Sequence, residues 1–250
     1  MAEGNNKKKK LIKAAAALLF TAVFVVASVF WARYTMRLKA YHTEPVTEDT
    51  LLPIGIMSCD KLMIVAHPDD ESIWGGGHLS EGGYLVVCIT NGKNSERKQE
   101  FIDVVDKSGN TPLILGYPDK LFGERDNWDN VRDNIMADIS FIMRYKDWKL
   151  IVTHNPDGEY GHIHHKMTSE LTTKAYNRLK PAAKLYYFGK YYKAADIGSA
   201  EGLSPISDEQ LAFKNELLKL YESQGKTVDK FRHMLPYEMW TEYGSTQGDI

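Results

Sequence analysis

The sequence has very little cysteine: Cys59 and Cys88 are the only two in 250 residues. It contains no CxxC pair and no cysteine-rich cluster, which excludes a metal site built on thiolates. Outside the cell the two could form one disulfide, since a loop of about thirty residues can be closed. The alternative is that Cys88 is a buried thiol within the apolar run 85–89. Both arrangements stay open at the level of sequence.

Positive charge is scarce outside the N-terminus. Residues 1–40 carry eight lysines and arginines and one acid, so the other 210 residues carry 23 basic and 32 acidic side chains, a formal charge of −9. Nucleic-acid binding depends on clustered lysines and arginines. We therefore expect no nucleic-acid partner for this acidic part of the chain.

One long uncharged run lies near the N-terminus, from Ala14 to Ala32. A helix of that length, rising about 1.5 Å per residue, crosses roughly the hydrocarbon layer of a bilayer. Five lysines precede the run and three basic residues follow it, which favours a cytoplasmic N-terminus and an extracytoplasmic domain. The rival interpretation is a cleaved signal peptide, whose apolar region is usually shorter and ends in a small-x-small site. We predict an uncleaved, single-pass membrane anchor.

The rest of the chain alternates between short apolar strands and helical segments. The predicted parts are a basic tail (1–13), the anchor (14–32), a tether (33–57) and one domain (58–250). Strands are predicted at 61–66, 84–90, 111–115, 149–154 and 184–189, and helices at 70–81, 95–107, 129–146, 162–179 and 207–223. Such alternation is typical of parallel βαβ units. It predicts an α/β domain with a mostly parallel sheet flanked by helices, with ligands bound at the carboxyl ends of the strands.

Two polar clusters follow predicted strands. The first is His67-Pro68-Asp69-Asp70-Glu71, directly after the apolar run 62–66. The second is Gly161-His162-Ile163-His164-His165, a short way beyond the apolar run 150–153. A single histidine or aspartate at a strand end usually caps a helix or forms a turn. Two such clusters at two strand ends favour one divided metal site.

The chemistry of the two clusters fits a catalytic metal. Zinc takes histidine nitrogen and carboxylate oxygen, and a catalytic site keeps one position open for water. The first cluster can supply His67 and one aspartate, while the other aspartate faces the water as a base. His162 and His165 are three residues apart and share a face if their segment opens a helix.

Other polar residues have simpler explanations. The run Gly75-Gly76-Gly77 lacks the Lys-Ser/Thr of a phosphate loop, so close packing of a helix is predicted there. His78 and His154 are expected to be structural. Trp74 and Trp128 are expected either to stack on a sugar ring or to be buried.

Several short motifs occur in a fixed order. AHPDDE at 66–71 follows the first strand, Thr90-Asn91-Gly92 follows the second, and Gly-His-x-x-His comes at 161–165. Further matches are Arg97-x-x-Glu100, Leu115-Gly116-Tyr117-Pro118-Asp119 and Lys214…Tyr221-x-Ser223-Gln224. In this order, over roughly residues 60–225, the chain resembles the PIG-L/LmbE-like N-acetylglucosaminyl de-N-acetylases.

The resemblance implies a hydrolase on a Rossmann-like sheet that removes the acetyl group from N-acetylglucosamine units and releases acetate. It implies one catalytic Zn²⁺ ion, bound by His67, Asp70 and His165. The substrate of such an anchored enzyme would be an N-acetylated sugar in a glycan or glycolipid, either envelope-linked or lipid-linked.

The resemblance also implies roles for the remaining site residues. Asp69 would be the general base. His162 would stabilise the oxyanion or protonate the leaving amine, and Tyr160 would assist at the carbonyl. Arg97 and Asp119 match positions associated with sugar binding, although a helix-surface charge and a turn acid explain them equally well.

The chain departs from the family at one place. Where the family commonly has Pro-Asp, this sequence has Ile163-His164. A carboxylate beside His162 would raise its pKa and fix its orientation, so its absence puts a general-acid role of His162 in question. His164 also becomes a candidate for a competing metal ligand, as the minor alternative to the three ligands above.

Two other functions stay open at the level of sequence. One is a catalytically silent sugar-binding protein on the same fold, and the other is a metal amidase that acts on a non-sugar amide. An intact set of ligands and a base favours the deacetylase, because a binding protein has no need of them.

Overall fold

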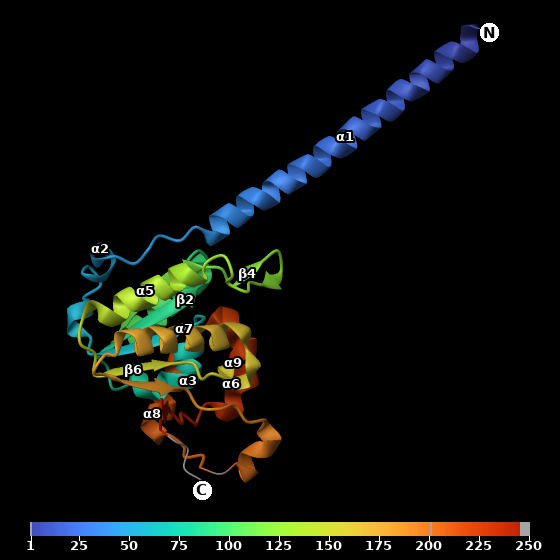
Figure 1. Ribbon diagram of the computed structural model, residues 1–250. Helices are drawn as coiled ribbons and strands as arrows, with labels where there is room; N and C mark the ends of the chain where they lie inside the picture. The colour runs from blue at the N-terminus through green and yellow to red at the C-terminus, as the bar shows by residue number, and fades with distance from the viewer. Residues whose placement is uncertain (1, 201, 246–250) are drawn as a thin grey trace. The chain divides into compact units, whose positions relative to one another are not determined.

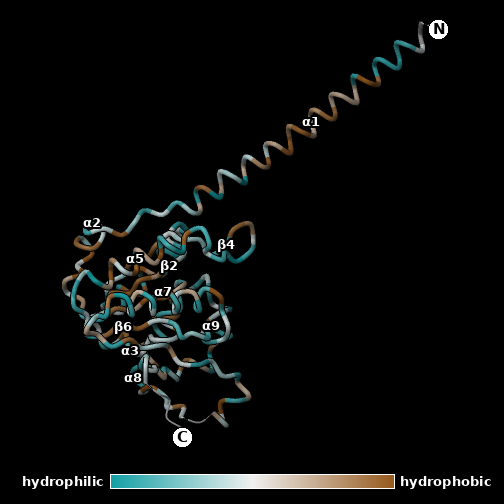
Figure 2. The backbone as a smooth tube through the Cα atoms, viewed as in Figure 1, coloured by the Kyte–Doolittle hydropathy of each residue, from teal (hydrophilic) through white to brown (hydrophobic). Residues whose placement is uncertain are grey.

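The computed structural model describes residues 2–200 and 202–245, and its contacts divide the chain into two units, residues 1–42 and 43–250. The first unit is one helix, α1 (Ala2–Tyr41), which extends beyond both ends of the predicted anchor 14–32. Among the described residues this is the helix long and apolar enough to cross a membrane, with a mean hydropathy of 2.3 over its most apolar stretch. Figure 2 shows that stretch in brown between two more polar ends. A signal sequence has the same character.

The second unit is built on a sheet with the strand order β3-β2-β1-β6-β7-β8. Its strands are β1 (Lys61–Val65), β2 (Tyr84–Thr90), β3 (Thr111–Tyr117), β6 (Leu150–Thr153), β7 (Lys184–Tyr187) and β8 (Thr241–Glu242). All neighbours are parallel except β8, which pairs antiparallel with β7. A separate hairpin joins β4 (Lys120–Leu121) to β5 (Glu124–Arg125). The predicted mostly parallel sheet is confirmed, whereas the short strands β4, β5 and β8 were not predicted.

Helices cover both faces of this sheet (Figure 1). The helices of this unit are α2 (Glu48–Leu51), α3 (Asp70–Leu79), α4 (Ser95–Lys107), α5 (Arg132–Tyr145), α6 (Gly158–Gly161), α7 (Ile163–Leu179), α8 (Asp208–Leu218) and α9 (Gly225–Phe231). Helices α5 and α7 pack together on one side, and α3 and α8 on the other (Figure 1). The predicted helix 207–223 ends earlier, at Leu218, and the separate helix α9 was not predicted.

The neighbouring strands β1 and β2 are buried almost throughout, which explains their unbroken apolar sequences. Every residue of β2 is buried, and in β1 all but Lys61 are. Strands covered on both faces need apolar residues at every position rather than an alternating pattern. Cys59 and Cys88 are both buried free thiols, so the structure has no disulfide between them.

Strand order reverses beside β1, and this places the functional groups. The chain runs outward from β1 through β2 to β3, then returns to the other side of β1 as β6. In open α/β sheets a crevice forms at such a switch point, outside the carboxyl ends of the strands. Both polar clusters follow the two strands that flank it, β1 and β6.

The glycine run in α3 serves packing, as predicted. A Cβ atom on Gly75 would lie 2.8 Å from Cε of Met63, in the sheet. One on Gly76 would lie 2.8 Å from Cγ of Lys214, in α8. A Cβ at Gly76 has no room beside the buried stem of Lys214, and one at Gly75 would displace the end of Met63, so these glycines let α3 lie close to both α8 and the sheet.

A buried ion pair is bonded to the C-terminal end of α3. Nζ of Lys214 lies 2.8 Å from Oε1 of Glu238, and both side chains are fully buried. Oε1 of Glu238 also accepts a hydrogen bond from the backbone N–H of Gly77 at 2.7 Å, and Oε2 lies 2.7 Å from Nδ1 of His78. Burial opposes ionisation of Glu238, but the Lys214 ammonium and His78 outweigh it and lower the pKa of Glu238 to about 2. The pair therefore ties α8 and the C-terminal segment to α3.

We predict that Glu238→Gln destabilises the protein by about 3–5 kcal/mol near neutral pH, because it leaves the Lys214 ammonium buried without a counter-charge. The folded pKa of Glu238, about 2, lies below its usual value of 4.5. Its stabilisation is therefore complete above pH 4.5 and is lost as the pH falls toward 2. Urea denaturation of both proteins from pH 7 to pH 3 measures this. A difference that stays constant with pH would contradict the assignment.

Candidate metal centre

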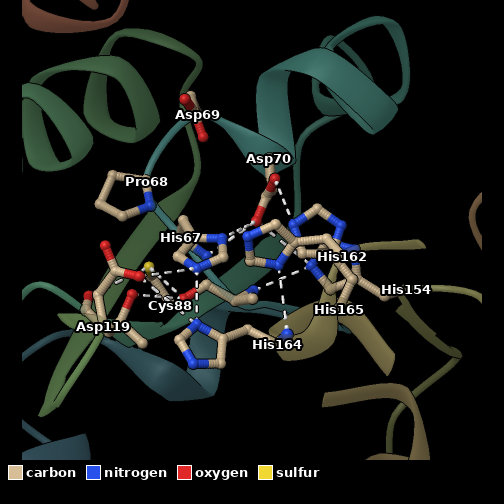
Figure 3. A network of polar contacts seen from close by, with 12 residues as sticks. His67, Pro68, Asp69, Asp70, Cys88, Asp119, His154, His162, His164 and His165 are labelled. Carbon is tan, nitrogen blue, oxygen red and sulfur yellow. Dashed lines mark hydrogen bonds and ion pairs between the residues drawn. The ribbon is translucent and has the colours of Figure 1, made fainter. Parts of the chain in front are cut away.

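The two polar clusters meet at the carboxyl ends of β1 and β6 (Figure 3). His67 lies two residues beyond β1, and Asp70 is the first residue of α3. His162 caps the N-terminus of α7, and His165 lies in the first turn of that helix. Residues almost a hundred positions apart in sequence thus form one group of imidazoles and carboxylates.

The three predicted ligands lie close together. Nδ1 of His67 is 3.2 Å from Oδ2 of Asp70, and Nε2 of His165 is 3.2 Å from Oδ1 of Asp70. The exposed fractions of these residues are 7% for His67, 4% for Asp70 and 0% for His165. One carboxylate therefore lies between the two imidazoles that are expected to share a metal with it.

The state of His165 fits a metal ligand. Its Nδ1 is hydrogen-bonded to Oε2 of Glu159, and since a carboxylate oxygen accepts, in the neutral ring Nδ1 carries the proton and Nε2 a lone pair. Nε2 is buried and has no hydrogen-bond partner. A buried nitrogen lone pair that faces a carboxylate oxygen is costly unless a cation or proton joins them. Imidazole nitrogen with carboxylate oxygen is also the donor set that zinc accepts.

Glu159 supports this arrangement and was missed by the sequence analysis. Its Oε2 accepts hydrogen bonds from Nδ1 of both His154, at 3.1 Å, and His165. Burial opposes its ionisation, but His154 and His165 outweigh it and lower the pKa of Glu159 to about 2. The backbone of Glu159 has a positive φ of 52°. No sequence pattern marks such a residue, because a distorted loop brings it to the site.

His154 was expected to be structural, and the structure places it against the candidate metal ligands Asp70 and His165. It is fully buried, and its Nε2 lies 3.4 Å from Oδ2 of Asp70. The same Nε2 accepts a hydrogen bond from the backbone N–H of Ala66 at 3.0 Å. With Nδ1 on Glu159 and Nε2 against Asp70, His154 supports both carboxylates.

The two adjacent aspartates point in different directions (Figure 3). Asp70 faces the imidazoles, whereas Asp69 stands apart from them, with its Oδ2 3.6 Å from Nη2 of Arg97. Burial and the negative charge of Asp70 raise the pKa of Asp69 well above its usual range. Burial opposes the ionisation of Asp70, but His165 and His154 hold its pKa well below that range. One carboxylate is thus suited to take up a proton and the other to stay charged.

The turn that separates the aspartates is strained and braced. Asp69 has a φ of 105°, which is rare for a residue with a side chain. Its backbone N–H donates to Oε2 of Glu71 at 3.1 Å. Glu71 is fully buried, and its Oε1 accepts a hydrogen bond from the hydroxyl of Tyr221 at 2.7 Å. Glu71 therefore supports the turn.

His162 and Tyr160 lie beside His165, with ring centroids 4.5 and 5.4 Å from its ring. Nδ1 of His162 accepts a hydrogen bond from the backbone N–H of His164 at 3.2 Å, so in the neutral ring the proton is on Nε2. Burial and the neighbouring His67 and His165 lower the pKa of His162 to about 2. Burial and the charges of the two aspartates raise the pKa of the Tyr160 hydroxyl. Both side chains are therefore neutral hydrogen-bond donors.

A cavity of about 280 Å³ opens above these groups, and every predicted site residue except His165 lines it. Its lining residues are His67, Asp69, Asp70, Ile73, Asn91, Asn94, Arg97, Asp119, Lys120, Arg125, Tyr160, His162, Gln224, Thr227 and Phe231.

Arg97 bonds the backbone carbonyl of Pro68, so it is part of the site rather than a free helix-surface charge. Asp119 forms an ion pair with Arg125 of the β4–β5 hairpin, which the sequence analysis did not identify.

His164, the residue that departs from the family pattern, is also buried in the centre. Its Nδ1 lies 3.0 Å from Nε2 of His67, on the side of that ring away from Asp70. Its ring stacks on Trp128 with a centroid distance of 4.4 Å. Trp74 and Trp128 are 3% and 0% exposed and line no part of this cavity, so the buried interpretation holds for both.

Comparison with known proteins gives the same family as the motifs. A family model described as PIG-L, GlcNAc-PI de-N-acetylase, matches residues 62–176. A protein of Acanthamoeba polyphaga mimivirus, described as uncharacterized, is 34% identical over 188 residues, which is 68% of this chain and 74% of that protein.

We predict that Glu159→Gln weakens zinc binding about 10–100-fold, because an amide cannot accept strongly from both His154 and His165. Competition with a chromophoric chelator measures the affinity. Glu96→Gln, which changes an exposed carboxylate of α4, is the matched control and should bind zinc as the wild type does. Equal affinities in all three proteins would contradict a supporting role for Glu159.

Proposed function

This chain belongs to the PIG-L family, and we propose that it is a membrane-anchored, zinc-dependent hydrolase that removes the N-acetyl group from a GlcNAc-containing glycan or glycolipid. The observation that carries the proposal is the division of labour in the first cluster. Asp70 faces His67 and His165, while Asp69, with its raised pKa, lines the cavity beside them. Metal-assisted hydrolysis of an amide uses both a set of metal ligands and a separate base.

The proposed ligands are His67, Asp70 and His165, with Glu159 orienting His165. The support is the unpartnered Nε2 of His165 together with the two 3.2 Å approaches to Asp70. A zinc ion held there would lower the pKa of water and polarise the acetamide carbonyl. Buried, well-oriented ligands favour a fixed position for the reacting amide.

Asp69 is the proposed general base. A base must lie within reach of the attacking water without coordinating the metal, and its pKa must be close to the working pH. Asp69 lines the cavity, and burial and the charge of Asp70 raise its pKa. The proton that Asp69 takes from the water is then available to the leaving amine, which cannot depart without one.

His162 and Tyr160 are the proposed hydrogen-bond donors to the oxyanion. Nε2 of His162 carries a proton because Nδ1 accepts from the backbone of α7. The Tyr160 hydroxyl stays protonated because its pKa is raised. Neutral donors aimed at a developing negative charge are worth about 10²–10³ in turnover each. Of the two roles expected for His162, oxyanion stabilisation is the one that a neutral ring supports.

The proposed sugar-binding residues are Arg97 and Asp119. Both line the cavity, and Arg125 and Lys120 lie beside Asp119 in the same lining. Charged side chains that hydrogen-bond hydroxyl groups are typical of sugar sites. A cavity of this volume is at the small end of ligand sites, which suits a single sugar unit held at its acetamide.

Acetate release tests the function directly. The purified full-length chain should release acetate from N-acetylated sugars, free or lipid-linked, and a chelator should abolish the release. Added zinc should restore it, because the ligand set is intact in the folded protein. Binding of GlcNAc ligands without acetate release, under any metal, would instead indicate a silent sugar-binding protein.

We predict that Asp69→Asn lowers acetate release about 10²–10⁴-fold, since it removes the base, while zinc stoichiometry stays unchanged. Turnover and metal content of the same samples measure this. Asp106→Asn, in an exposed part of α4, is the matched control and should keep wild-type activity. Substantial activity in Asp69→Asn would exclude Asp69 as the base.

We also propose that α1 is an uncleaved single-pass anchor with a cytoplasmic N-terminus and an extracytoplasmic domain. The basic flank before the apolar stretch favours that orientation. Protease added to intact cells should then remove the catalytic domain and leave the N-terminus protected. Full protection of the domain would place it in the cytoplasm, and an N-terminus that begins beyond the apolar stretch would show cleavage.

A further inference from the structure

His164 lies in a continuous line of hydrogen-bonding groups that ends on His67. Nε2 of His164 lies 2.7 Å from the backbone carbonyl oxygen of Asp126. Nδ1 of His164 lies 3.0 Å from Nε2 of His67. The ring of His164 is fully buried, so no solvent competes for either nitrogen.

The carbonyl oxygen of Asp126 sets the proton positions on His164 and His67. A carbonyl oxygen only accepts, so Nε2 of His164 must carry a proton toward Asp126. Nδ1 of the neutral His164 ring is then an acceptor, and Nε2 of His67 is the donor. With its proton on Nε2, the neutral His67 ring has its lone pair on Nδ1. That is the nitrogen facing Asp70, at 3.2 Å. Since a carboxylate oxygen also only accepts, this tautomer fits the contact of Nδ1 with Asp70 when a cation lies between them.

The position of His164 is itself fixed. Its ring lies on the indole of Trp128, at 4.4 Å between centroids and 8° between planes. The indole Nε1–H of Trp128 donates to the carbonyl oxygen of Pro118 at 2.8 Å, and its backbone N–H donates to Oδ1 of Asp126 at 2.7 Å. The loop that supplies the acceptor of the line also supplies the surface on which the ring rests.

We propose that His164 is a positioning residue that fixes the tautomer and the ring orientation of His67, so that Nδ1 of His67 presents its lone pair to the metal. The inference rests on the proposed function in one respect, which is that His67 is a ligand. Histidine ligands commonly donate their second N–H to a fixed acceptor, usually a carboxylate or a carbonyl. Here a second histidine is that acceptor, and a backbone carbonyl fixes it in turn.

The same atoms allow a rival explanation, a second metal ion. Oδ1 of Asp119 lies 3.5 Å from both Nε2 of His67 and Nδ1 of His164, and the three residues have the spacing of a ligand set. Two contacts argue against a cation there. Asp119 is already paired with Arg125, and the guanidinium of Arg125 lies 3.4 Å from Nε2 of His67. The 3.0 Å contact also leaves neither imidazole nitrogen without a partner.

Two substitutions distinguish the role of His164 as a hydrogen-bond acceptor from the packing of its ring. His164→Phe keeps an aromatic ring on Trp128 but removes the acceptor for His67. His164→Asn removes the ring but places an amide oxygen near the position of Nδ1, where it can accept from His67. The measurements are zinc affinity by chelator competition and zinc stoichiometry, on full-length protein in detergent, with thermal unfolding to check that each variant is folded.

We expect His164→Phe to bind one zinc ion about 10–100-fold more weakly than the wild type, and His164→Asn to recover most of that loss. Cobalt substituted for zinc should show an altered visible spectrum in His164→Phe and a near wild-type spectrum in His164→Asn. Such a pattern requires an acceptor at position 164 and is not produced by loss of packing.

Three outcomes would overturn the proposal. Equal affinity in the wild type and His164→Phe would show that the acceptor does not matter. Equal losses in both folded variants would show that the ring, not the acceptor, is required. Two tightly bound ions in the wild type and one in His164→Phe would establish the second metal site instead. A wild type that binds zinc but releases no acetate would count against the proposed function and leave the role of His164 standing.

Discussion

The turn from His67 to Asp70 is the constraint on which the site depends. It must turn one carboxylate toward the imidazoles and the next one away from them, although the two residues are adjacent. The backbone achieves this only with Asp69 at a φ of 105°. A conformation of this kind costs of order 1–3 kcal/mol and persists only where its surroundings hold it. Glu71 does so by accepting the N–H of Asp69, and Arg97 by bonding the carbonyl of Pro68.

The C-terminal third of the domain secures that turn from outside. Tyr221 bonds Glu71 directly, and Ser223 bonds both carboxylate oxygens of Glu100, on the helix that carries Arg97. Lys214 and its partner Glu238 fasten the glycine face of α3. The C-terminal motif Lys214…Tyr221-x-Ser223-Gln224 thus mostly supports the turn of the motif at 66–71. Only Gln224 among its residues lines the cavity.

Much of this could be predicted from sequence, and the rest could not for identifiable reasons. The strands β1 and β2 are unbroken apolar runs, so their positions and the sheet edge that gathers the polar clusters were predictable. The hairpin β4–β5 has strands of two residues, too short for any period, and so Arg125 was missed. Glu159 reaches its two histidines through a loop with positive φ, which no local pattern announces. Its role depends on contacts that only the folded chain creates.

Position 69 needs both a backbone φ that suits glycine and a carboxylate side chain, and no single residue offers both. A φ of 105° is adopted readily only by glycine, so Asp69→Gly would relieve the backbone strain and stabilise the folded domain. Glycine has no carboxylate, so the more stable chain would lack the proposed base. Selection for stability and selection for turnover therefore act in opposite directions at this residue. Stabilised variants of this protein that keep their activity must therefore gain their stability outside the turn, in the contacts of Tyr221, Ser223 and Lys214 that support it.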